Sequence, residues 1–452
     1  MGILAQPTPQ EQICLMRWRQ STLWVMIVGY VGYYLCRNNL TAALPLLSQE
    51  FHYSNTELGM ILTISELAYA FGKLVNGPLA DHWGGKKIFL VGMVGAILCN
   101  VLFIQFQNLF MFTLVWSLCR YFLSMGWGGL MKIIGAWYEP ERNGTIMGIV
   151  SINFQAGSGL SLVLCSLLLS WGFNWQALFT VPAGIVSLIA IWSYYGCKNA
   201  PDDVVKNARF GARASDRKTI FDQVGKENLA LNARQILQTL FSLPSFRTLL
   251  TFSFLTTFLR SIFMFWTAKF LVDIGMGNAN AIMKSAIFPF LGVLGTVLLG
   301  YYTDRFAGNG DRAKAMWIML LGLMASLFFI AYLVPYRLMY QDWIVFLTGA
   351  SGFFLYGPYS MTAGCLTLDI AGAKAAGTAA GVIDSVGYVG GALAAWSAGF
   401  LSDYLGWDQV FYFLCAVSGL SVLAAYRLSM IFQASSTEAS HQLVGLFPES
   451  NV

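Results

Sequence analysis

Residues 251–271 read TFSFLTTFLRSIFMFWTAKFL, and this stretch decides the fold. It is an apolar run of about 21 residues, long enough to cross a ~30 Å hydrocarbon layer as a helix. One charge, Arg260, lies near its middle. Because a guanidinium cannot lose its proton, Arg260 must face protein, water or an anion rather than lipid. The stretch therefore predicts a membrane-spanning helix that carries a functional arginine.

The same pattern occurs once more, near the start of the chain. Residues 24–44 form a second apolar run, interrupted mainly by Arg37 and two asparagines. Asp81 follows Arg37 by 44 positions and Asp304 follows Arg260 by the same interval, each at the end of a Gly-x-x-x-Asp segment. This spacing indicates an internal repeat, in which the two halves of the chain are related in sequence. Internal repeats with a binding site where the halves meet are typical of secondary transporters.

The composition predicts the same class of protein. Hydrophobic residues make up 57% of the chain, charged residues make up 11%, and the mean hydropathy is +0.61. A soluble core of this length would need more charge to cover it, so we expect a polytopic membrane protein. The eight cysteines lack metal-ligand spacing, and no phosphate-binding loop or catalytic triad occurs in the sequence. We therefore expect no enzyme activity, cofactor, metal or nucleic-acid partner.

The apolar segments predict an all-α membrane protein with twelve transmembrane helices in two pseudo-symmetric six-helix bundles. The expected spans are residues 21–43, 57–80, 87–106, 109–136, 144–170, 174–196, 247–271, 282–302, 313–335, 341–368, 375–402 and 407–431. Lysine and arginine concentrate in the even-numbered loops, which include Arg142 and Lys374. The positive-inside rule therefore places both termini in the cytoplasm. The predicted location is the plasma membrane, which in a bacterium is the inner membrane.

This pattern divides the chain into four parts. Residues 1–196 form the first bundle and residues 247–431 form the second. Between them, residues 197–246 are predicted to be a cytoplasmic linker that ends in LNARQILQTLF, a candidate amphipathic helix at the membrane surface. Residues 432–452 are the predicted cytoplasmic tail.

Ionisable side chains within the spans mark the candidate site, because each is costly in lipid. They are Arg37, Glu66, Lys73, Arg120, Arg260 and Asp384. The two repeat-related arginines predict a clamp on an anion, since guanidinium forks match carboxylate or phosphate oxygens. The alternative is a pair of structural ion pairs with Glu66 and Asp384. Lys73 shares one helix face with Glu66, and it either attracts the anion or extends its amine to the membrane surface.

Arg120 and Asp384 have no counterpart in the other half. An ion pair of Arg120 with Asp384 or with Glu66 is the alternative to a substrate role for these residues. Asp384 follows Lys374 by about ten residues, or ~15 Å of helix, which is close to the membrane midplane. An ion pair is favoured for it because buried charges are neutralised where a partner exists. If its partner changes during transport, Asp384 or Glu66 could instead carry protons.

Asp81 and Asp304 each lie at the predicted cytoplasmic end of a span, beside a basic loop. Their repetition predicts a charge-paired latch that opens and closes with the cytoplasmic gate, and Arg142 belongs to the same group of gating candidates. The alternative is an ordinary solvated helix end.

These Gly-x-x-x-Asp loops resemble the signature of the major facilitator superfamily. Further segments between about residues 25 and 430 resemble the organophosphate:phosphate antiporter family: YYLCRNNLTAALP, AYAFGKLVNGPLAD, SMGWGG, FLYGP and KAAGTAAG. That family includes glycerol-3-phosphate and hexose-phosphate carriers and a related hexose-phosphate sensor. The resemblance implies the major facilitator fold and exchange of an organophosphate for inorganic phosphate. It also implies that Arg37 and Arg260 bind phosphate and that Lys73 is the functional lysine of span 2.

The sequence departs from this family around the arginines. Asn153 stands where the phosphate antiporters usually have a histidine, and the usual Asp-Trp of span 7 is Phe265-Trp266. Asn153, Trp266 and Tyr356 complete the substrate-binding candidates. Transport of a small, phosphorylated anion by a monomer in the bilayer is the prediction. Two alternatives stay open: a proton-coupled organic-anion transporter, and a hexose-phosphate sensor with a transporter fold.

Overall fold

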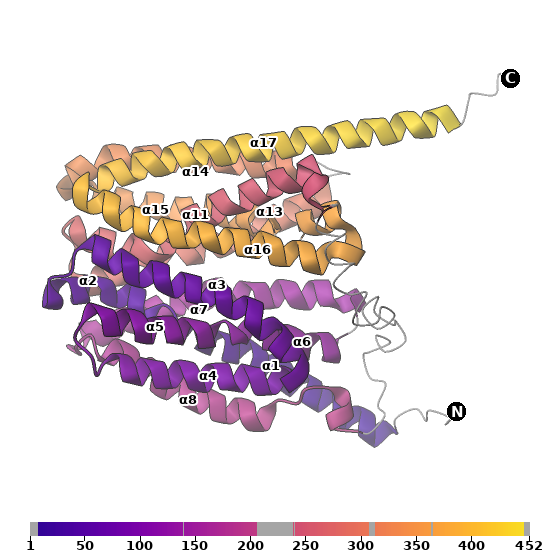
Figure 1. Cartoon of the computed structure of the whole chain (residues 1–452), viewed down its shortest axis with the longest axis horizontal. Helices are drawn as coiled ribbons and strands as arrows, with labels where there is room; N and C mark the ends of the chain where they lie inside the picture. Colours follow the sequence, from indigo (N-terminus) through magenta and orange to yellow (C-terminus); the bar gives the residue numbers. More distant parts are fainter. Residues whose placement is uncertain are drawn as a thin grey trace. The chain divides into compact units, whose positions relative to one another are not determined.

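A computed structural model describes residues 8–138, 140–205, 238, 240–306, 312–362 and 365–446. These residues are helical and contain no β-strand (Figure 1). Ten stretches of helix among them are long and apolar enough to cross a membrane, and the longest, Arg312–Thr362, contains two successive helices. An all-α membrane fold is therefore confirmed.

The described residues of the first half form eight α-helices and a short 3-10 helix. They are α1 (Pro9–Leu35), α2 (Asn39–Phe51), α3 (Asn55–Trp83), α4 (Gly85–Phe103), α5 (Leu109–Leu123), α6 (Met125–Trp137), α7 (Pro140–Ser170), α8 (Ala177–Gly196) and η1 (Pro201–Asp203). The second half forms α11 (Pro244–Asp273), α12 (Asn278–Ser285), α13 (Ile287–Phe306), α14 (Arg312–Leu333), η3 (Val334–Tyr336), α15 (Arg337–Thr362), α16 (Cys365–Tyr404) and α17 (Trp407–Leu446). Most described residues of the predicted spans are helical, and the number of twelve transmembrane helices stays a prediction.

By their contacts, the residues divide into two units. Unit 1 comprises Met1–Gly225, Phe265–Ala286 and Ala395–Phe400, and unit 2 comprises Lys226–Met264, Ile287–Ala394 and Leu401–Val452. In unit 1, α1 packs on α7 and α8, and α4 packs on α5, α6 and α8. In unit 2, α14 packs on α15 and α17, and α13 packs on α15. The domain borders at 196, 246 and 431 stay a prediction.

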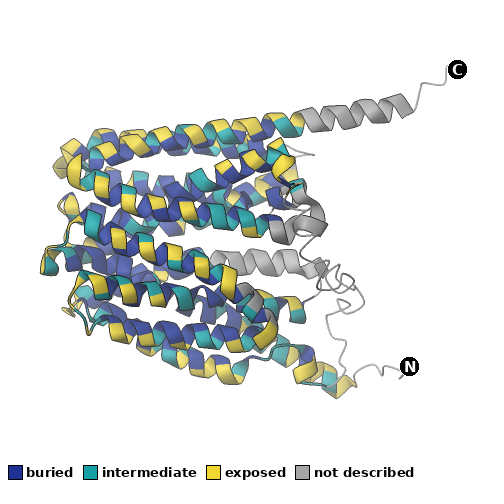
Figure 2. Ribbon diagram, in the orientation of Figure 1, coloured by how far each residue is buried: buried dark blue, intermediate teal, exposed yellow. Residues whose placement is uncertain are grey.

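The outer faces of these helices are apolar. Figure 2 shows exposed residues alternating with buried ones along most helices. Many of the exposed side chains are large and hydrophobic, among them Leu188 on α8, Leu98 on α4 and Leu423 on α17. In water such surfaces would promote aggregation, whereas in a bilayer they face the acyl chains.

The first span is broken at its arginine. Helix α1 ends at Leu35 and α2 begins at Asn39, so Arg37 lies in the turn between them. Asparagine side chains compete with the backbone for hydrogen bonds and thereby interrupt a helix: Asn39 Oδ1 accepts the backbone N–H of Leu40 at 3.0 Å. The matching helix in the second half, α11, runs through Arg260 without a break. The repeat in the sequence is therefore not a repeat of local backbone structure.

Asn100 on α4 supports this break. Its Nδ2 donates to the carbonyl oxygen of Cys36 at 3.4 Å, and its Oδ1 accepts a hydrogen bond from Nδ2 of Asn39. Backbone groups freed inside a membrane must find partners within the protein. Asn100 supplies such a partner, and the sequence analysis did not single it out.

We expect Asn100→Ala to destabilise the protein by about 2 kcal/mol, because the groups it serves are buried and lose their partner. Thermal unfolding of the detergent-solubilised protein measures the effect. Ser187→Ala is the control, since the Ser187 hydroxyl bonds only within its own helix, to Ala183. Equal unfolding temperatures for Asn100→Ala and Ser187→Ala would contradict a supporting role for Asn100.

Two helices are longer than predicted. Helix α16 begins at Cys365 rather than near residue 375, so Lys374 lies within a helix and not in a loop. The segment AGAKAAGTAA contains no proline, and its six alanines, which have the highest helix propensity, offset its two glycines. Helix α17 continues to Leu446, beyond the predicted limit at 431. The amphipathic helix expected near residue 235 falls almost entirely outside the described residues.

Candidate functional site

In unit 1, charged side chains surround the ring of Tyr69 on α3. The Cζ atoms of Arg37 and Arg120 both lie 4.6 Å from the ring centroid, and Nζ of Lys73 lies 5.8 Å from it. These distances fall within the ~6 Å over which an aromatic face attracts a cation. Tyr69 and Arg120 are buried, whereas Arg37 and Lys73 are half-buried, so the attraction of the ring offsets part of the cost of removing these cations from water.

One carboxylate belongs to this cluster. Glu66 forms an ion pair with Arg120, and the two side chains are 1% and 3% exposed. Of the two partners predicted for Arg120, the structure shows Glu66. In the described part of the chain, the three cations over Tyr69 and the Glu66 carboxylate together carry a formal charge of +2. An excess of positive charge in a membrane protein interior favours the binding of an anion.

The sequence assembles this cluster through helix geometry. Glu66, Tyr69 and Lys73 are spaced i, i+3 and i+7, so they share one face of α3. Arg120 comes from the last turn of α5, which packs against α3. Arg37 comes from the turn between α1 and α2. Tyr69 was not predicted from the sequence, although its spacing from Glu66 and Lys73 places it on their helix face.

Two buried asparagines in unit 1 have amide nitrogens without a hydrogen bond to the described residues. They are Asn153 on α7, which is 7% exposed, and Asn38 in the turn beside Arg37, which is 4% exposed. Helix α7 runs close along α1, because Gly157 has only hydrogen where a Cβ would lie 3.0 Å from Tyr34. Buried polar groups nearly always have a partner, so these two nitrogens are candidates to bind a polar ligand.

In unit 2, Arg260 is also stacked on a tyrosine. Its Cζ lies 4.8 Å from the ring centroid of Tyr359 on α15, and the arginine is buried. Tyr356, one turn earlier on α15, is buried as well, and its hydroxyl lies 3.1 Å from Sδ of Met264 on α11. The two tyrosines and Arg260 therefore gather where α11 faces α15. Tyr359 was not predicted from the sequence.

Asp384 lies half-buried on α16, also in unit 2. Helix α16 passes close to α11 there, since Ser253 Oγ donates to the carbonyl oxygen of Ile383 at 3.3 Å. A Cβ on Gly387 would lie 2.8 Å from Oγ1 of Thr257. This places Asp384 beside the helix that carries Arg260. Its pairing with an arginine stays a prediction.

The remaining predicted residues are less informative. Trp266 is buried, and its Nε1 donates to the carbonyl oxygen of Ala395 at 3.1 Å within unit 1. That bond holds the ring in place, and the predicted contact of Trp266 with substrate stays a prediction. The backbones of Asp81, Asp304 and Arg142 are helical, but their side chains lie outside the described part of the chain. No group of acidic, histidine or cysteine side chains in the described part could hold a metal ion.

The sequence of the chain matches the family model described as Major Facilitator Superfamily over residues 26–395 and, in a second match, 285–442. The chain belongs to the Major Facilitator Superfamily. Among solved structures, this superfamily member is similar to a bacterial homologue of the human lysosomal transporter Spinster, with a TM-score of 0.72 at 15% identity, covering 92% of this chain and 98% of that one. A structure of the nucleoside transporter NupG gives a TM-score of 0.67 at 13% identity, over 90% and 98% of the chains. These similarities confirm the fold.

Curated relatives of this superfamily member share more of its sequence. The "Glycerol-3-phosphate transporter" of Bacillus subtilis is 28% identical over 88% of this chain and 89% of its own length. The "Probable hexose phosphate transport protein" of Chlamydia pneumoniae is 24% identical over 90% of both. The "Membrane sensor protein UhpC" of Escherichia coli is 24% identical over 90% and 91%. The resemblance predicted from the short motifs is thus confirmed along most of the chain. The relatives and the apolar helices together indicate an integral multi-pass membrane protein.

Proposed function

We propose that the chain is a secondary transporter that moves a small organophosphate, such as a glycerol phosphate or a sugar phosphate, by alternating access. The observation that carries the proposal is the cluster at Tyr69, where the buried Arg120 pairs with Glu66 and the half-buried Arg37 and Lys73 lie over the same ring. Two of the relatives named above are described as carriers of phosphorylated solutes, which supports the same substrate class.

The two repeat-related arginines bind the phosphoryl group in this proposal. The N–H donors of a guanidinium match two oxygens of a phosphate. Both Arg37 and Arg260 have Cζ over the face of a tyrosine ring, at 4.6 and 4.8 Å from the centroid. Lys73 adds a point charge, and the amide of Asn153 and the hydroxyl of Tyr356 are suited to the polar carbon part of the substrate. The anion neutralises the arginines, which lowers the cost of closing the site.

Exchange in proteoliposomes tests the proposal. Vesicles that contain the purified protein are loaded with inorganic phosphate and presented with labelled glycerol-3-phosphate or glucose-6-phosphate. We expect uptake from phosphate-loaded vesicles and little from empty ones, because the empty cationic site is costly to close within the membrane. Absence of both binding and uptake with every phosphorylated solute tested would contradict an organophosphate substrate.

The same assay recognises a second function, that of a membrane sensor. This candidate is favoured by the similarity to the sensor protein named above, which extends over 90% of the chain. A sensor would bind the phosphorylated solute with measurable affinity and show no flux in loaded vesicles. Binding without flux would therefore replace the transport proposal by the sensor proposal.

Coupling to protons is the third possibility, and Asp384→Asn tests it. We expect this variant to be less stable than wild type, because an ion pair is the favoured state of a carboxylate near the membrane midplane. If Asp384 carries protons instead, the variant loses uptake driven by a pH gradient and keeps exchange between like substrates. The measurement is the pH dependence of exchange in the two proteins, with Asp202→Asn on the exposed helix η1 as the control. Identical profiles with a fully stable variant would leave Asp384 without either role.

Asp81 and Asp304, which occur at matching positions of the repeat, and Arg142 are proposed to control the conformational change. In this proposal the two aspartates form charge-paired latches at the cytoplasmic ends of α3 and α13, away from the substrate. In this proposal the chain acts as a monomer in the inner membrane. Both termini lie in the cytoplasm, as the distribution of lysine and arginine predicts.

A further inference from the structure

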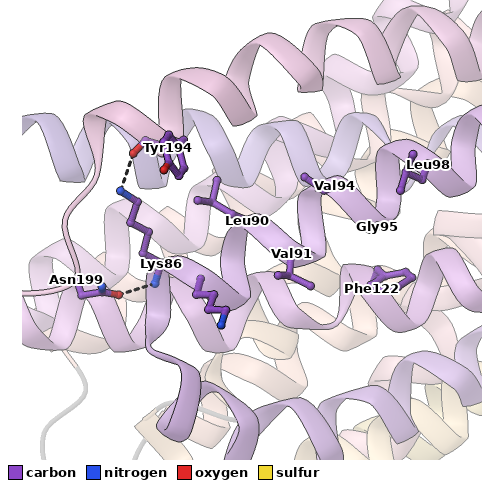
Figure 3. Close-up of a pocket in the computed structure, with 10 residues that line it drawn as sticks. Lys86, Leu90, Val91, Val94, Gly95, Leu98, Phe122, Tyr194 and Asn199 are labelled. Carbon is purple, nitrogen blue, oxygen red and sulfur yellow. Dashed lines mark hydrogen bonds between the residues drawn. The ribbon is translucent and has the colours of Figure 1, made fainter.

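A groove of about 540 Å³ runs along α4 in unit 1 (Figure 3). Its walls are apolar: Leu90, Val94 and Leu98 from α4, Phe122 from α5, and the ring of Tyr194 from α8. One end is basic, because Lys86 and Lys87 line it. This groove shares no lining residue with the cluster at Tyr69, so its role is independent of the proposed function.

Lys86 is held firmly at the basic end. Its Nζ donates to the carbonyl oxygen of Tyr194 at 2.6 Å, and its backbone N–H donates to Oδ1 of Asn199 at 2.8 Å, as Figure 3 shows. An ammonium group has three donors, so the bond to Tyr194 leaves capacity for a further acceptor. Lys87 is exposed, and its Nζ lies 5.1 Å from the ring of Trp83. Two positive charges are therefore presented at one end of the groove.

The aromatic residues beside the lysines locate the membrane surface. Trp83 and Tyr194 are both exposed, and exposed tryptophan and tyrosine gather at the level of the lipid head groups. From Lys87 to Leu98, α4 rises about 16 Å, which is close to half of a ~30 Å hydrocarbon core. The apolar part of the groove thus has the depth of one leaflet.

The side chains within that depth face outward. Leu90, Val94 and Leu98 recur every four residues on one face of α4, and Val94 and Leu98 are 48% and 63% exposed. The recess beside them depends on Gly95, since a Cβ there would lie 2.2 Å from Cγ of Phe122. Because Gly95 has no side chain, the Phe122 ring packs directly onto α4 and forms a wall of the groove.

We propose that this groove is a binding site for an anionic phospholipid. One acyl chain lies along Leu90, Val94 and Leu98, and the phosphate binds Lys86 and Lys87. An open apolar groove within the bilayer is filled by an acyl chain in any case, and the two lysines select the charge of the head group. Basic residues near the membrane surface attract anionic lipids by about fivefold in affinity per lysine.

Native mass spectrometry of the full-length protein tests the site. The detergent-solubilised protein is titrated with phosphatidylglycerol and, separately, with phosphatidylcholine of the same acyl chains. We expect wild type to retain phosphatidylglycerol at least about tenfold better, from the two lysines together. We expect Lys86→Gln/Lys87→Gln to remove this preference, and Val94→Trp, which fills the groove, to reduce retention of both lipids at this site.

Three further variants make the result specific. Lys198→Gln removes a lysine that also rests on an aromatic ring, that of Trp18, but does not line the groove. Leu188→Trp enlarges an exposed apolar residue of α8 outside the groove. Both should behave as wild type. Lys86→Arg/Lys87→Arg keeps the charge and should keep the preference, which separates loss of the site from misfolding of the glutamine variant.

Several outcomes would overturn the proposal. Equal retention of the two lipids by wild type would show that the groove does not select charge. An unchanged preference in Lys86→Gln/Lys87→Gln would place the anionic site elsewhere. Glycerol-3-phosphate is added as a competitor without acyl chains. Full displacement of phosphatidylglycerol by it would show that the lysines bind a free phosphate rather than a lipid.

Discussion

Arg37→Lys and Arg260→Lys are each expected to reduce exchange of a phosphorylated solute by about a hundredfold or more, with the protein still folded. Both variants keep the positive charge and change only its shape. An ammonium is a point charge, whereas a guanidinium presents two parallel N–H donors to two phosphate oxygens. Loss of one charge-assisted pair of this kind costs up to about 3 kcal/mol, which corresponds to the expected factor.

The tyrosine stacking increases this effect. Arg37 and Arg260 lie over the rings of Tyr69 and Tyr359, and a lysine has no planar group to stack in their place. Arg19→Lys is the matched control, because Arg19 is stacked on Tyr138 with its Cζ 4.2 Å from the ring centroid, near the start of the first span. Counterflow rates measured for all three variants decide the matter. Wild-type rates in both Arg37→Lys and Arg260→Lys would contradict the proposal that the two arginines bind the anion.

Glu66→Gln is expected to be the most destabilising of the substitutions proposed here, by about 3–5 kcal/mol. The change removes the carboxylate of a buried ion pair and leaves the buried guanidinium of Arg120 without that counter-charge. It also takes the Glu66 carboxylate away from the three cations around Tyr69, so their mutual repulsion rises. Thermal unfolding in detergent measures the loss.

The double variant Glu66→Gln/Arg120→Gln should recover most of this stability. It removes one charge of each sign, so the formal charge of the cluster is unchanged and anion exchange should persist. A double-mutant cycle then gives the coupling between Glu66 and Arg120. Asp273→Asn is the control, since it opens the more exposed ion pair with Lys269 and should cost no more than about 1 kcal/mol. A Glu66→Gln variant as stable as wild type would show that the pair contributes little to folding.

Much of the fold could be predicted because its cause is local. An apolar run of sufficient length must form a helix in a membrane, since the bilayer offers no partner to a bare backbone. For this reason most described residues of the predicted spans are helical, and the repeated arginines 37 and 260 were found from spacing alone. The ends of α16 and α17 were missed because the sequence there contains no strong stop signal, and helix propensity by itself extends the helix.

The sequence by itself determined the membrane class, the two related halves and the presence of charges within the spans. Only the tertiary structure decided which charges meet. Spacing along one helix places Glu66 beside Lys73, but the choice of Arg120 as its partner depends on how α5 packs against α3. The same holds for Tyr359 under Arg260 and for Asn100 at the α1–α2 break. These contacts join residues distant in sequence, and helical periodicity, which repeats every 3.6 residues, carries no information about them.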